Sequence, residues 1–283
     1  MIAWLGTGLL GSGFVHALLE RGETVRVWNR SIDKARALEA GGATAVADAA
    51  EAVRGAARVH VCLSDDRAVD EVLEAARPGL AKGQIIVDHT TTSPAGAAER
   101  VTRWAERGMR FQHAPVFMGP QNAREASGFM LASGDKGLYD ELAPALSKMT
   151  GRLLYFGPIP ERAAGMKLLG NLFLVSMVAG ATDVLALGKA MGIPAGDVAG
   201  LFESFNPGAQ LPARMKRMLD ADFAHPSWNL AMARKDTRLM MEAADRGGVP
   251  LKFIPAAAAE MDRYLAAGHS ADDWTVISSA VVK

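Results

Sequence analysis

A glycine-rich turn near the N-terminus is the feature that most limits the folds open to this chain. The turn reads Gly6-Thr7-Gly8-Leu9-Leu10-Gly11, directly after the apolar run Ile2–Leu5 and at the start of a helical pattern. In a strand–turn–helix unit, Gly6 allows the tight turn, Gly8 lets a pyrophosphate approach the backbone, and Gly11 lets helix and strand pack closely. The helix N-terminus offers free N–H groups and a partial positive charge to the phosphates. The sequence therefore predicts a dinucleotide site; the alternative is a glycine turn without a ligand.

The first half of the chain alternates short apolar runs with helical segments, as a parallel α/β sheet requires. We predict strands at Ile2–Leu5, Thr24–Trp28, Val59–Leu63, Ile85–Val87, Arg110–His113 and Leu153–Phe156, and the first helices at Leu10–Arg21 and Ile32–Ala40. Gly22 is placed to end the first helix and Ser31 to cap the second. Strand, helix, strand in this order gives right-handed crossovers. The predicted fold class is therefore α/β, a Rossmann doubly wound parallel sheet.

The pattern changes near residue 160. Pro158 and Pro160 interrupt the chain, and no strand-like run follows. From Glu161 to Met191, apolar residues at helical spacing without an internal proline predict one long helix between two domains. Shorter helices are expected at Pro194–Phe205, Pro212–Leu219, Asn229–Arg246 and Ile254–Ala267. We predict an NADP-binding Rossmann domain over residues 1–160 and an all-helical substrate and oligomerisation domain over residues 161–283.

The end of the second predicted strand bears on the choice of dinucleotide. Sites that prefer NAD usually place an acidic residue there to bind the ribose 2′-hydroxyl. This chain has Trp28-Asn29-Arg30-Ser31 instead. Arg30 can pair with a 2′-phosphate, and Asn29 and Ser31 can hydrogen-bond to it. These residues predict NADPH (NADP+) as the cofactor, with NAD(H) bound less well; the alternative is a surface arginine beside a helix cap.

Composition and charge disfavour several classes of protein. Hydrophobic residues make up 49% and charged residues 22%, as in a globular chain. Lys plus Arg and Asp plus Glu each number 31, so no net charge draws the chain to nucleic acid or to an anionic membrane. The one cysteine, Cys62, excludes an internal disulfide and fits a reducing compartment. With no leader after Met1, and with the apolar stretch around residues 172–187 expected to be a buried helix, we predict a cytoplasmic protein without a membrane span or a metal site.

Five short segments, spread over nearly the whole chain, form a further pattern. They are the glycine turn with Asn29-Arg30, Asp88-His89-Thr90-Thr91-Thr92-Ser93-Pro94, Ala114-Pro115-Val116, Gly165-Met166-Lys167-Leu168-Leu169-Gly170-Asn171, and Lys235-Asp236. Together, and in this order, they resemble the β-hydroxyacid dehydrogenase family. That family includes 3-hydroxyisobutyrate dehydrogenase and tartronate semialdehyde or glyoxylate–succinic semialdehyde reductases, within the 6-phosphogluconate dehydrogenase superfamily.

Lys167 and Asn171 stand four residues apart at the start of the long predicted helix, so they project from one face. The resemblance implies that Lys167 is the general acid/base and that Asn171 helps to hold substrate and lysine in place. Hydride delivered to a carbonyl carbon leaves an alkoxide, which an ammonium can stabilise and protonate. Efficient transfer calls for a lysine pKa lowered from ~10.4 towards ~7–8. The alternative for a lysine early in a helix is a solvated side chain.

The same resemblance assigns roles to four residues beyond the glycine turn. Thr91 would lie near the nicotinamide end of the cofactor, and Leu63 and Ser64 would flank the cofactor. Lys235 would approach the active site from a later helix. Two alternatives stay open: the segment around Thr91 caps the next helix, and Lys235 pairs with Asp236 or with solvent.

The segment expected to contact substrate departs from the family's usual Asp-Ala-Pro-Val-Ser-Gly-Gly. Here it reads His113-Ala114-Pro115-Val116-Phe117-Met118-Gly119. In the family, the serine and first glycine present small groups and N–H donors to a substrate carboxylate, whereas Phe117 and Met118 add apolar bulk. We expect the last four residues, Val116, Phe117, Met118 and Gly119, to line the substrate site and to favour a more apolar carbonyl compound. His113, which replaces an acid, is expected to be packed and hydrogen-bonded.

Three functions remain open. The first is NADPH-dependent interconversion of a small aldehyde, of semialdehyde or glyoxylate type, with its hydroxy acid or alcohol. The second is an imine reductase, which shares this architecture but generally lacks the family's lysine. The third is a non-enzymatic module that keeps the fold for dinucleotide sensing or protein interaction. Lys167 favours the first, whose expected partners are a small-molecule carbonyl substrate and further copies of the chain in a homodimer or homotetramer.

Overall fold

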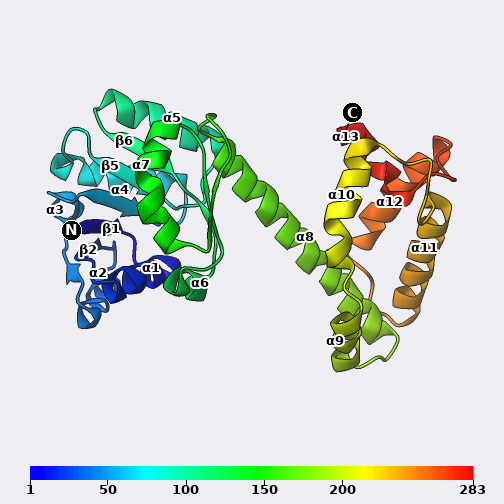
Figure 1. Cartoon of the computed structure of the whole chain (residues 1–283). Coiled ribbons are helices and arrows are strands. Elements are labelled where there is room, and N and C mark those ends of the chain that lie inside the picture. The colour runs from blue at the N-terminus through cyan, green and yellow to red at the C-terminus, as the bar shows by residue number, and fades with distance from the viewer. Residues whose placement is uncertain (283) are drawn as a thin grey trace. The chain divides into compact units, whose positions relative to one another are not determined.

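The computed structural model describes residues 1–282, which divide into two compact units. The first unit spans Met1–Leu172, and the second begins at Phe173. Helix α8 (Arg162–Ala190) starts in the first unit and continues into the second (Figure 1). This helix confirms the long helix predicted from residue 161 to residue 191. The domain boundary that we propose near residue 160 lies just before it.

The first unit is built on a six-stranded parallel sheet, ordered β3-β2-β1-β4-β5-β6. Its strands are β1 (Ile2–Leu5), β2 (Val25–Trp28), β3 (Thr44–Ala45), β4 (Arg58–Val61), β5 (Ile85–Asp88) and β6 (Arg110–His113). The strand order runs outward in both directions from β1 and β4, so the doubly wound prediction is confirmed. The carboxyl ends of β1 and β4 therefore flank the switch point at which such sheets bind ligands.

Helices cover both faces of this sheet: α1 (Leu9–Glu20), α2 (Ile32–Arg36), α3 (Ala49–Val53), α4 (Asp66–Ala76), α5 (Pro94–Glu106), α6 (Pro120–Glu125) and α7 (Lys136–Leu146). Strand β1 shows why two cores form. Ile2 and Trp4 enter one apolar cluster, whereas Ala3 and Leu5 enter the other. Side chains alternate between the faces of a strand, so a strand buried on both sides must be apolar at every position.

Three strands of the first unit form a second, smaller sheet, ordered β7 (Val116–Phe117), β8 (Phe129–Ala132) and β9 (Arg152–Tyr155). Strand β8 pairs antiparallel with β7 and parallel with β9. The run at residues 153–156 is thus a strand, as predicted, but it belongs to this second sheet. The predicted helix at Ile32–Ala40 is too long, because α2 ends at Arg36 and a 3₁₀ turn leads to Gly42, whose φ of 98° an L side chain rarely adopts.

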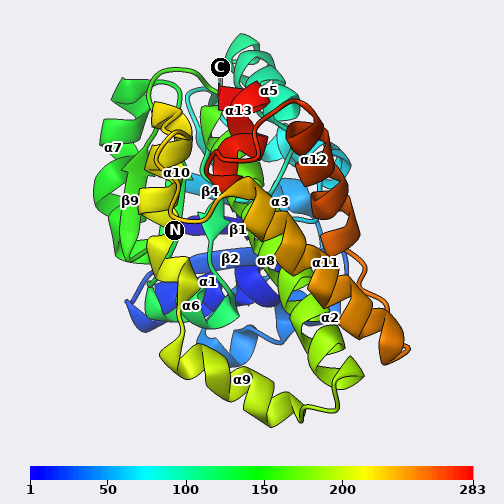
Figure 2. The same ribbon diagram turned by 90° about the vertical axis from the view of Figure 1, so that its right-hand side faces the viewer.

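The second unit is helical beyond α8, as predicted. It contains α9 (Ala195–Ser204), α10 (Leu211–Asp220), α11 (Leu230–Arg246), α12 (Ile254–Ala266) and α13 (Ser279–Val282). Helices α11 and α12 pack side by side (Figure 2). Their small core includes Leu230, Met261 and Tyr264. Asp183 of α8 joins this unit by accepting the backbone N–H groups of residues 252, 253 and 254, each at 2.8 Å.

Helix α8 corrects one expectation. Its apolar stretch was expected to be a buried helix, but only 6% of its most apolar 18-residue window is buried in the single chain. Val175 is 67% exposed and Val178 is 62% exposed. Apolar side chains occur all round this helix, so neighbours on one side leave the others uncovered. By length and composition alone α8 could cross a membrane. In this structure, however, Lys167 lines the cavity of the first unit, and Asp183 accepts backbone N–H groups of the second.

Candidate functional site

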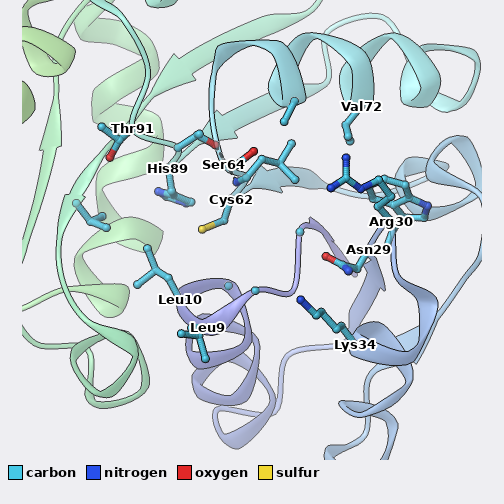
Figure 3. Close-up of a pocket in the computed structure, with 18 of the residues that line it drawn as sticks. Leu9, Leu10, Asn29, Arg30, Lys34, Cys62, Ser64, Val72, His89 and Thr91 are labelled. Carbon is cyan, nitrogen blue, oxygen red and sulfur yellow. Dashed lines mark hydrogen bonds between the residues drawn. The ribbon is translucent and has the colours of Figure 1, made fainter.

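A cavity of about 560 Å³ opens at the carboxyl edge of the large sheet and lies wholly within the first unit. It is lined by Gly6, Gly8, Leu9, Leu10, Gly11, Trp28, Asn29, Arg30, Ser31, Lys34, Cys62, Leu63, Ser64, Ala68, Glu71, Val72, His89, Thr90, Thr91, Val116, Met118 and Lys167. The cavity therefore lies at the switch point and brings together segments that are far apart in the sequence (Figure 3). Most of the predicted site residues line it.

The glycine turn shapes the floor of this cavity for steric reasons. Gly6 has a φ of 100°, and a Cβ on it would lie 2.2 Å from the carbonyl oxygen of Cys62. A Cβ on Gly11 would lie 2.1 Å from the carbonyl oxygen of Gly6. A Cβ on Gly8, by contrast, would meet no atom within 4 Å. The backbone at Gly8 is therefore open to a ligand at the start of α1, and this fits the pyrophosphate of a dinucleotide.

Arg30, Asn29 and Lys34 gather at one end of the cavity (Figure 3). Arg30 and Lys34 are exposed, and neither forms an ion pair within residues 1–282. Asn29 has a structural task, because its Oδ1 accepts the N–H of Thr7 at 3.0 Å and its Nδ2 donates to the carbonyl oxygen of Ser31. Thr7 itself is buried outside the lining. The prediction missed Lys34, although its place four residues after Arg30 was a usable signal.

The loops after β4 and β5 form the middle of the cavity and are tied together. The N–H of Leu63 donates to Oγ1 of Thr90 at 3.0 Å, and the N–H of Thr90 donates to Asp88 at 2.9 Å. Ser64 and Thr91 line the cavity beside them. Ser93 also caps α5, since its Oγ accepts the N–H of Gly96. The segment thus both lines the cavity and caps a helix.

Two buried histidines form a row of hydrogen bonds that ends at the cavity lining, where His89 lies. Arg58 Nε donates to His60 Nε2 at 2.8 Å, His60 Nδ1 lies 2.9 Å from His89 Nε2, and His89 Nδ1 lies 2.8 Å from the carbonyl oxygen of Ala114. A guanidinium only donates and a carbonyl only accepts, so both neutral rings carry their proton on Nδ1. Burial, with neighbouring positive charge, lowers the pKa of His60 well below its usual value and that of His89 to about 4. Sequence reasoning missed His89 as a lining residue.

Two other groups near the cavity are excluded as reactive groups. Burial, together with the Asp88 carboxylate, raises the pKa of Cys62 to about 12, so its sulfur stays a thiol. His113 is buried with its Nε2 2.9 Å from the carbonyl oxygen of Thr90, as expected of a packed, hydrogen-bonded side chain. Within the described residues, no group of three or more His, Cys, Asp or Glu side chains is arranged to hold a metal ion.

Lys167 reaches the cavity from the start of α8. Ser133, just after β8, fixes this helix end, because its Oγ accepts the N–H of Ala163 and donates to the carbonyl oxygen of Pro160. Lys167 is 9% exposed, and its Nζ donates to Asn171 Oδ1 at 3.0 Å. Burial lowers the pKa of Lys167, and no carboxylate forms an ion pair with it in residues 1–282. The ammonium is therefore held partly desolvated beside the cavity.

The remaining predicted residues lie outside the cavity lining. Phe117 and Asn171 both contact Lys167, although neither lines the cavity. The N–H of Gly119 donates to Asn122 Oδ1 at 2.9 Å at the start of α6. Lys235 belongs to the second unit and forms an ion pair with Asp236 at 2.7 Å, which is the alternative considered for it. Its approach to the active site stays a prediction.

Comparison with known families decides the kind of protein. Residues 1–157, more than half of the chain, match the family described as the NAD binding domain of 6-phosphogluconate dehydrogenase. The chain belongs to this dehydrogenase family. Residues 162–281 match a second family model, the NAD-binding domain of NADP-dependent 3-hydroxyisobutyrate dehydrogenase. The family resemblance seen in the five segments is confirmed.

The chain is similar to two kinds of curated protein, a nuclear factor and a semialdehyde reductase. Cytokine-like nuclear factor N-PAC of Xenopus tropicalis is 28% identical over 99% of this chain, and that of Homo sapiens is equally similar. The chain spans about half the length of these relatives, 53% and 51%. Glyoxylate/succinic semialdehyde reductase 1 of Arabidopsis thaliana is 26% identical, over 99% of this chain and 98% of the plant protein.

Solved structures confirm the fold. An imine reductase from Myxococcus stipitatus in complex with NADP+ superposes with a TM-score of 0.92 at 20% identity, over 98% of both chains. A reductive aminase from Aspergillus terreus in complex with NADPH and ethyl levulinate gives 0.91 at 22% identity, over 99% of this chain and 98% of the other. At these identities the likeness establishes a shared architecture.

Proposed function

We propose that this protein is an NADPH-dependent oxidoreductase that interconverts a small aldehyde, of semialdehyde or glyoxylate type, with its hydroxy acid or alcohol. The observation that carries the proposal is the placement of Lys167. Its ammonium lines the same cavity as the glycine turn, is held by Asn171, and has no carboxylate partner among the described residues. A desolvated, unpaired ammonium beside a dinucleotide cavity is suited to stabilise and protonate an alkoxide.

The cavity residues divide the work of reduction. When NADPH is bound at the glycine turn, it would supply the hydride for the carbonyl carbon of the substrate. Lys167 orients the carbonyl oxygen, gives it a proton as the C–H bond forms, and is left as a neutral amine that solvent reprotonates. Asn171 fixes the lysine side chain through its Oδ1. In the oxidative direction, neutral Lys167 accepts the hydroxyl proton.

The proposed preference for NADPH rests on Arg30 and Lys34. Both cations line the cavity after β2, where they can pair with a 2′-phosphate. Related structures carry NADP+ or NADPH, and one variant carries NAD+. We expect Arg30→Ala to weaken NADPH binding by about tenfold, roughly 1.4 kcal/mol, and to leave NADH binding within about twofold. Fluorescence titration of both cofactors measures this; an equal loss for both would assign Arg30 a different role.

Turnover tests the proposed activity directly. NADPH absorbance is followed with glyoxylate, succinic semialdehyde, methylglyoxal, uncharged aldehydes and a cyclic imine, for the wild type and Lys167→Ala. We expect an aldehyde to be reduced and the rate to fall by 10²-fold or more in the variant. Lys82→Ala, at an exposed lysine outside the cavity lining, is the matched control, and Lys235→Ala reports separately whether Lys235 takes part. Turnover of aldehydes that is indifferent to Lys167 would contradict the proposal.

An imine reductase is the second candidate, because the wall next to Lys167 is apolar. Met118 lines the cavity, and Phe117 lies over the lysine. An iminium substrate, however, carries positive charge and would be repelled by the Lys167 ammonium. Reduction of the cyclic imine that improves in Lys167→Ala would favour this candidate.

A non-enzymatic module is the third reading, and the nuclear-factor name of the first relatives gives it support. The retained Lys167–Asn171 hydrogen bond disfavours it, because dinucleotide sensing alone does not need a desolvated acid. NADPH binding with no turnover of any carbonyl or imine would favour the module over both reductases.

We also propose that the protein is cytoplasmic and that α8 is covered by other copies of the chain, as a homodimer or homotetramer. The exposed apolar side chains of α8, such as Val175 and Val178, form more apolar surface than a monomer usually leaves in water. Light scattering should report an oligomer that Val178→Lys dissociates. A monodisperse wild-type monomer would refute this.

A further inference from the structure

The ring of Phe117 lies against the lysine that the proposed reaction uses. Lys167 Nζ is 4.2 Å from the ring centroid, within the range of a cation–π contact. The same ammonium donates to Asn171 at 3.0 Å. With its charge against the ring and one of its three N–H donors on the amide, the ammonium has at most two donors for the cavity that Lys167 lines.

The ring of Phe117 packs directly against Gly170, which has no side chain. A Cβ on Gly170 would lie 2.2 Å from Cζ of Phe117 and 2.7 Å from its Cε1. No residue with a side chain fits there unless the ring moves. Glycine inside a helix costs about 1 kcal/mol relative to alanine, and this cost is offset here by contact with the ring. Phe117 and Gly170 therefore form a matched pair, one turn of α8 from Lys167.

The strand that carries Phe117 is also fixed. Phe117 pairs with Phe129 of β8. Gly128, at a φ of 79°, passes so close that a Cβ would lie 2.7 Å from the carbonyl oxygen of Phe117 and 3.0 Å from Cγ of Met118. The apolar wall, made of Met118 in the cavity lining and of Phe117 against Lys167 beside that lining, is thus fixed by close backbone contacts.

This wall offers little to a carboxylate. Neither side chain has a hydrogen-bond donor, and the N–H of Gly119 is already given to Asn122. Of the cations among the described lining residues, Arg30 and Lys34 follow β2, and Lys167 gives one of its three N–H donors to Asn171 and needs another for the carbonyl oxygen. A carboxylate buried without donors or a counter-ion is strongly disfavoured.

From these contacts we infer that Phe117 determines the substrate class: it covers Lys167 and excludes a carboxylate next to the reacting carbonyl, so that the site takes aldehydes or ketones with an uncharged, apolar substituent. The inference rests on the proposed function and narrows it. It keeps the aldehyde reduction and replaces the charged semialdehyde or glyoxylate by its uncharged analogues: esters, amides and alkyl compounds are favoured over the free acids.

Substrate selectivity is the first test. The kcat/KM of succinic semialdehyde is compared with that of its methyl ester, which has the same chain without the charge. We expect the wild type to prefer the ester by about tenfold or more, roughly 1.4 kcal/mol. Phe117→Ser should erase most of that preference, and Phe117→Leu, which keeps the apolar bulk, should retain it within about twofold. A wild type that prefers the acid, or a ratio unmoved in F117S, would overturn the inference.

The titration of Lys167 is the second test and does not require turnover. It is followed by NMR of ¹³Cε-labelled lysine in the NADP+ complex and assigned with Lys167→Ala. F117S admits water and should raise the pKa of Lys167, whereas F117L keeps the burial, loses the ring face and should lower it further. Equal titration in all three proteins would show that the ring does not cover the lysine.

Binding separates failure of this inference from failure of the proposed function. If no carbonyl is reduced, the proposed function fails, and butyramide and butyrate binding to the NADP+ complex then measure the same exclusion. The wild type should bind butyramide at least about tenfold more tightly, and F117S should bind both alike. Butyrate bound as tightly as butyramide by the wild type would overturn the inference.

Discussion

At the residue scale, the candidate site is built from pairs of side chains, each of which depends on contact with the other. In the proposed reaction, Lys167 is suited to act as the acid because Asn171 holds its side chain and burial lowers its pKa. Phe117 reaches it because Gly170 leaves room. Asn29 binds the glycine turn through Thr7 and so holds Arg30 at the mouth of the cavity. Each of these roles depends on a contact between two residues. Double substitutions, which measure the coupling between the two residues, therefore test it better than single substitutions do.

If Phe117 packs on Gly170, Gly170→Ala should destabilise the wild type and stabilise the F117S variant. Gly170→Ala in the wild type should displace the ring, lowering kcat/KM for apolar aldehydes by about tenfold and stability by about 1–3 kcal/mol. The same change in F117S should stabilise the protein by up to about 1 kcal/mol, because alanine favours the helix and nothing blocks its Cβ. Urea unfolding and kinetics of the four proteins complete the cycle. Additive effects would contradict the contact.

The sequence predicted those residues whose roles follow from local geometry. The turn Gly6–Gly11 could be predicted from its spacing, because a side chain on Gly6 or Gly11 would collide with the backbone of a nearby segment. Ser93 could be predicted to cap a helix because a proline follows it. Gly170 and His89 could not be placed in this way. Their roles arise from packing between segments that are far apart in the chain, and a single sequence carries no record of that packing.

At the scale of elements, α8 links the two units through a different residue in each. Lys167 serves the cavity of the first unit, and Asp183 caps α12 in the second. The sequence predicted the helix and its length but not its exposure, because apolar composition shows only that burial is needed. It also missed β3 and β7, whose two residues are too few for a periodic signal, and the four-residue strand β8.

The cap made by Asp183 should matter for the second unit. Burial alone would raise the pKa of this carboxyl, but three backbone N–H donors outweigh burial and lower the pKa. Asp183→Asn places an amide N–H₂ against donors and should reduce the free energy of unfolding by about 2–3 kcal/mol at pH 7. The wild-type contribution is present above pH ~4 and is lost as pH falls through the lowered pKa. Urea unfolding, with exposed Asp197→Asn as control, measures this; equal effects of both changes would show that the cap is unimportant.

The buried His60–His89 pair links β4 and β5 and should make the fold sensitive to acid. Burial lowers both pKa values, and that of His89 falls to about 4. Histidine in the unfolded chain has a pKa of ~6.5, so between this pH and the lowered pKa the unfolded state binds more protons than the folded state. The free energy of unfolding is therefore highest above pH ~6.5 and falls as the pH drops below it. From pH 7 to pH 5 we expect a loss on the order of 2 kcal/mol from His89. Urea unfolding at both pH values should show this loss for the wild type and the exposed His225→Asn control, and less for His89→Asn. Equal pH dependence in all three would argue against the buried neutral pair.

At the scale of the whole molecule, the chain combines a doubly wound dinucleotide unit with a helical unit through one long helix. Family membership is established over both, since separate family models match residues 1–157 and 162–281. We propose that the apolar wall at Phe117 and Met118 sets this chain apart, because the family resemblance leads us to expect a segment that recognises a carboxylate there. The fold and the NAD(P) cofactor class follow from the family and its shared architecture, and the proposed substrate class follows from this departure.

The most direct test of the central claim is the single-turnover rate of hydride transfer from NADPH to the best aldehyde, measured against pH in the wild type and Lys167→Ala. If Lys167 is the general acid, the wild-type rate should fall as pH rises through a lysine pKa below ~10.4, and the variant should be at least about 10²-fold slower and insensitive to pH over that range. The same rate and the same pH profile in both proteins would contradict the account.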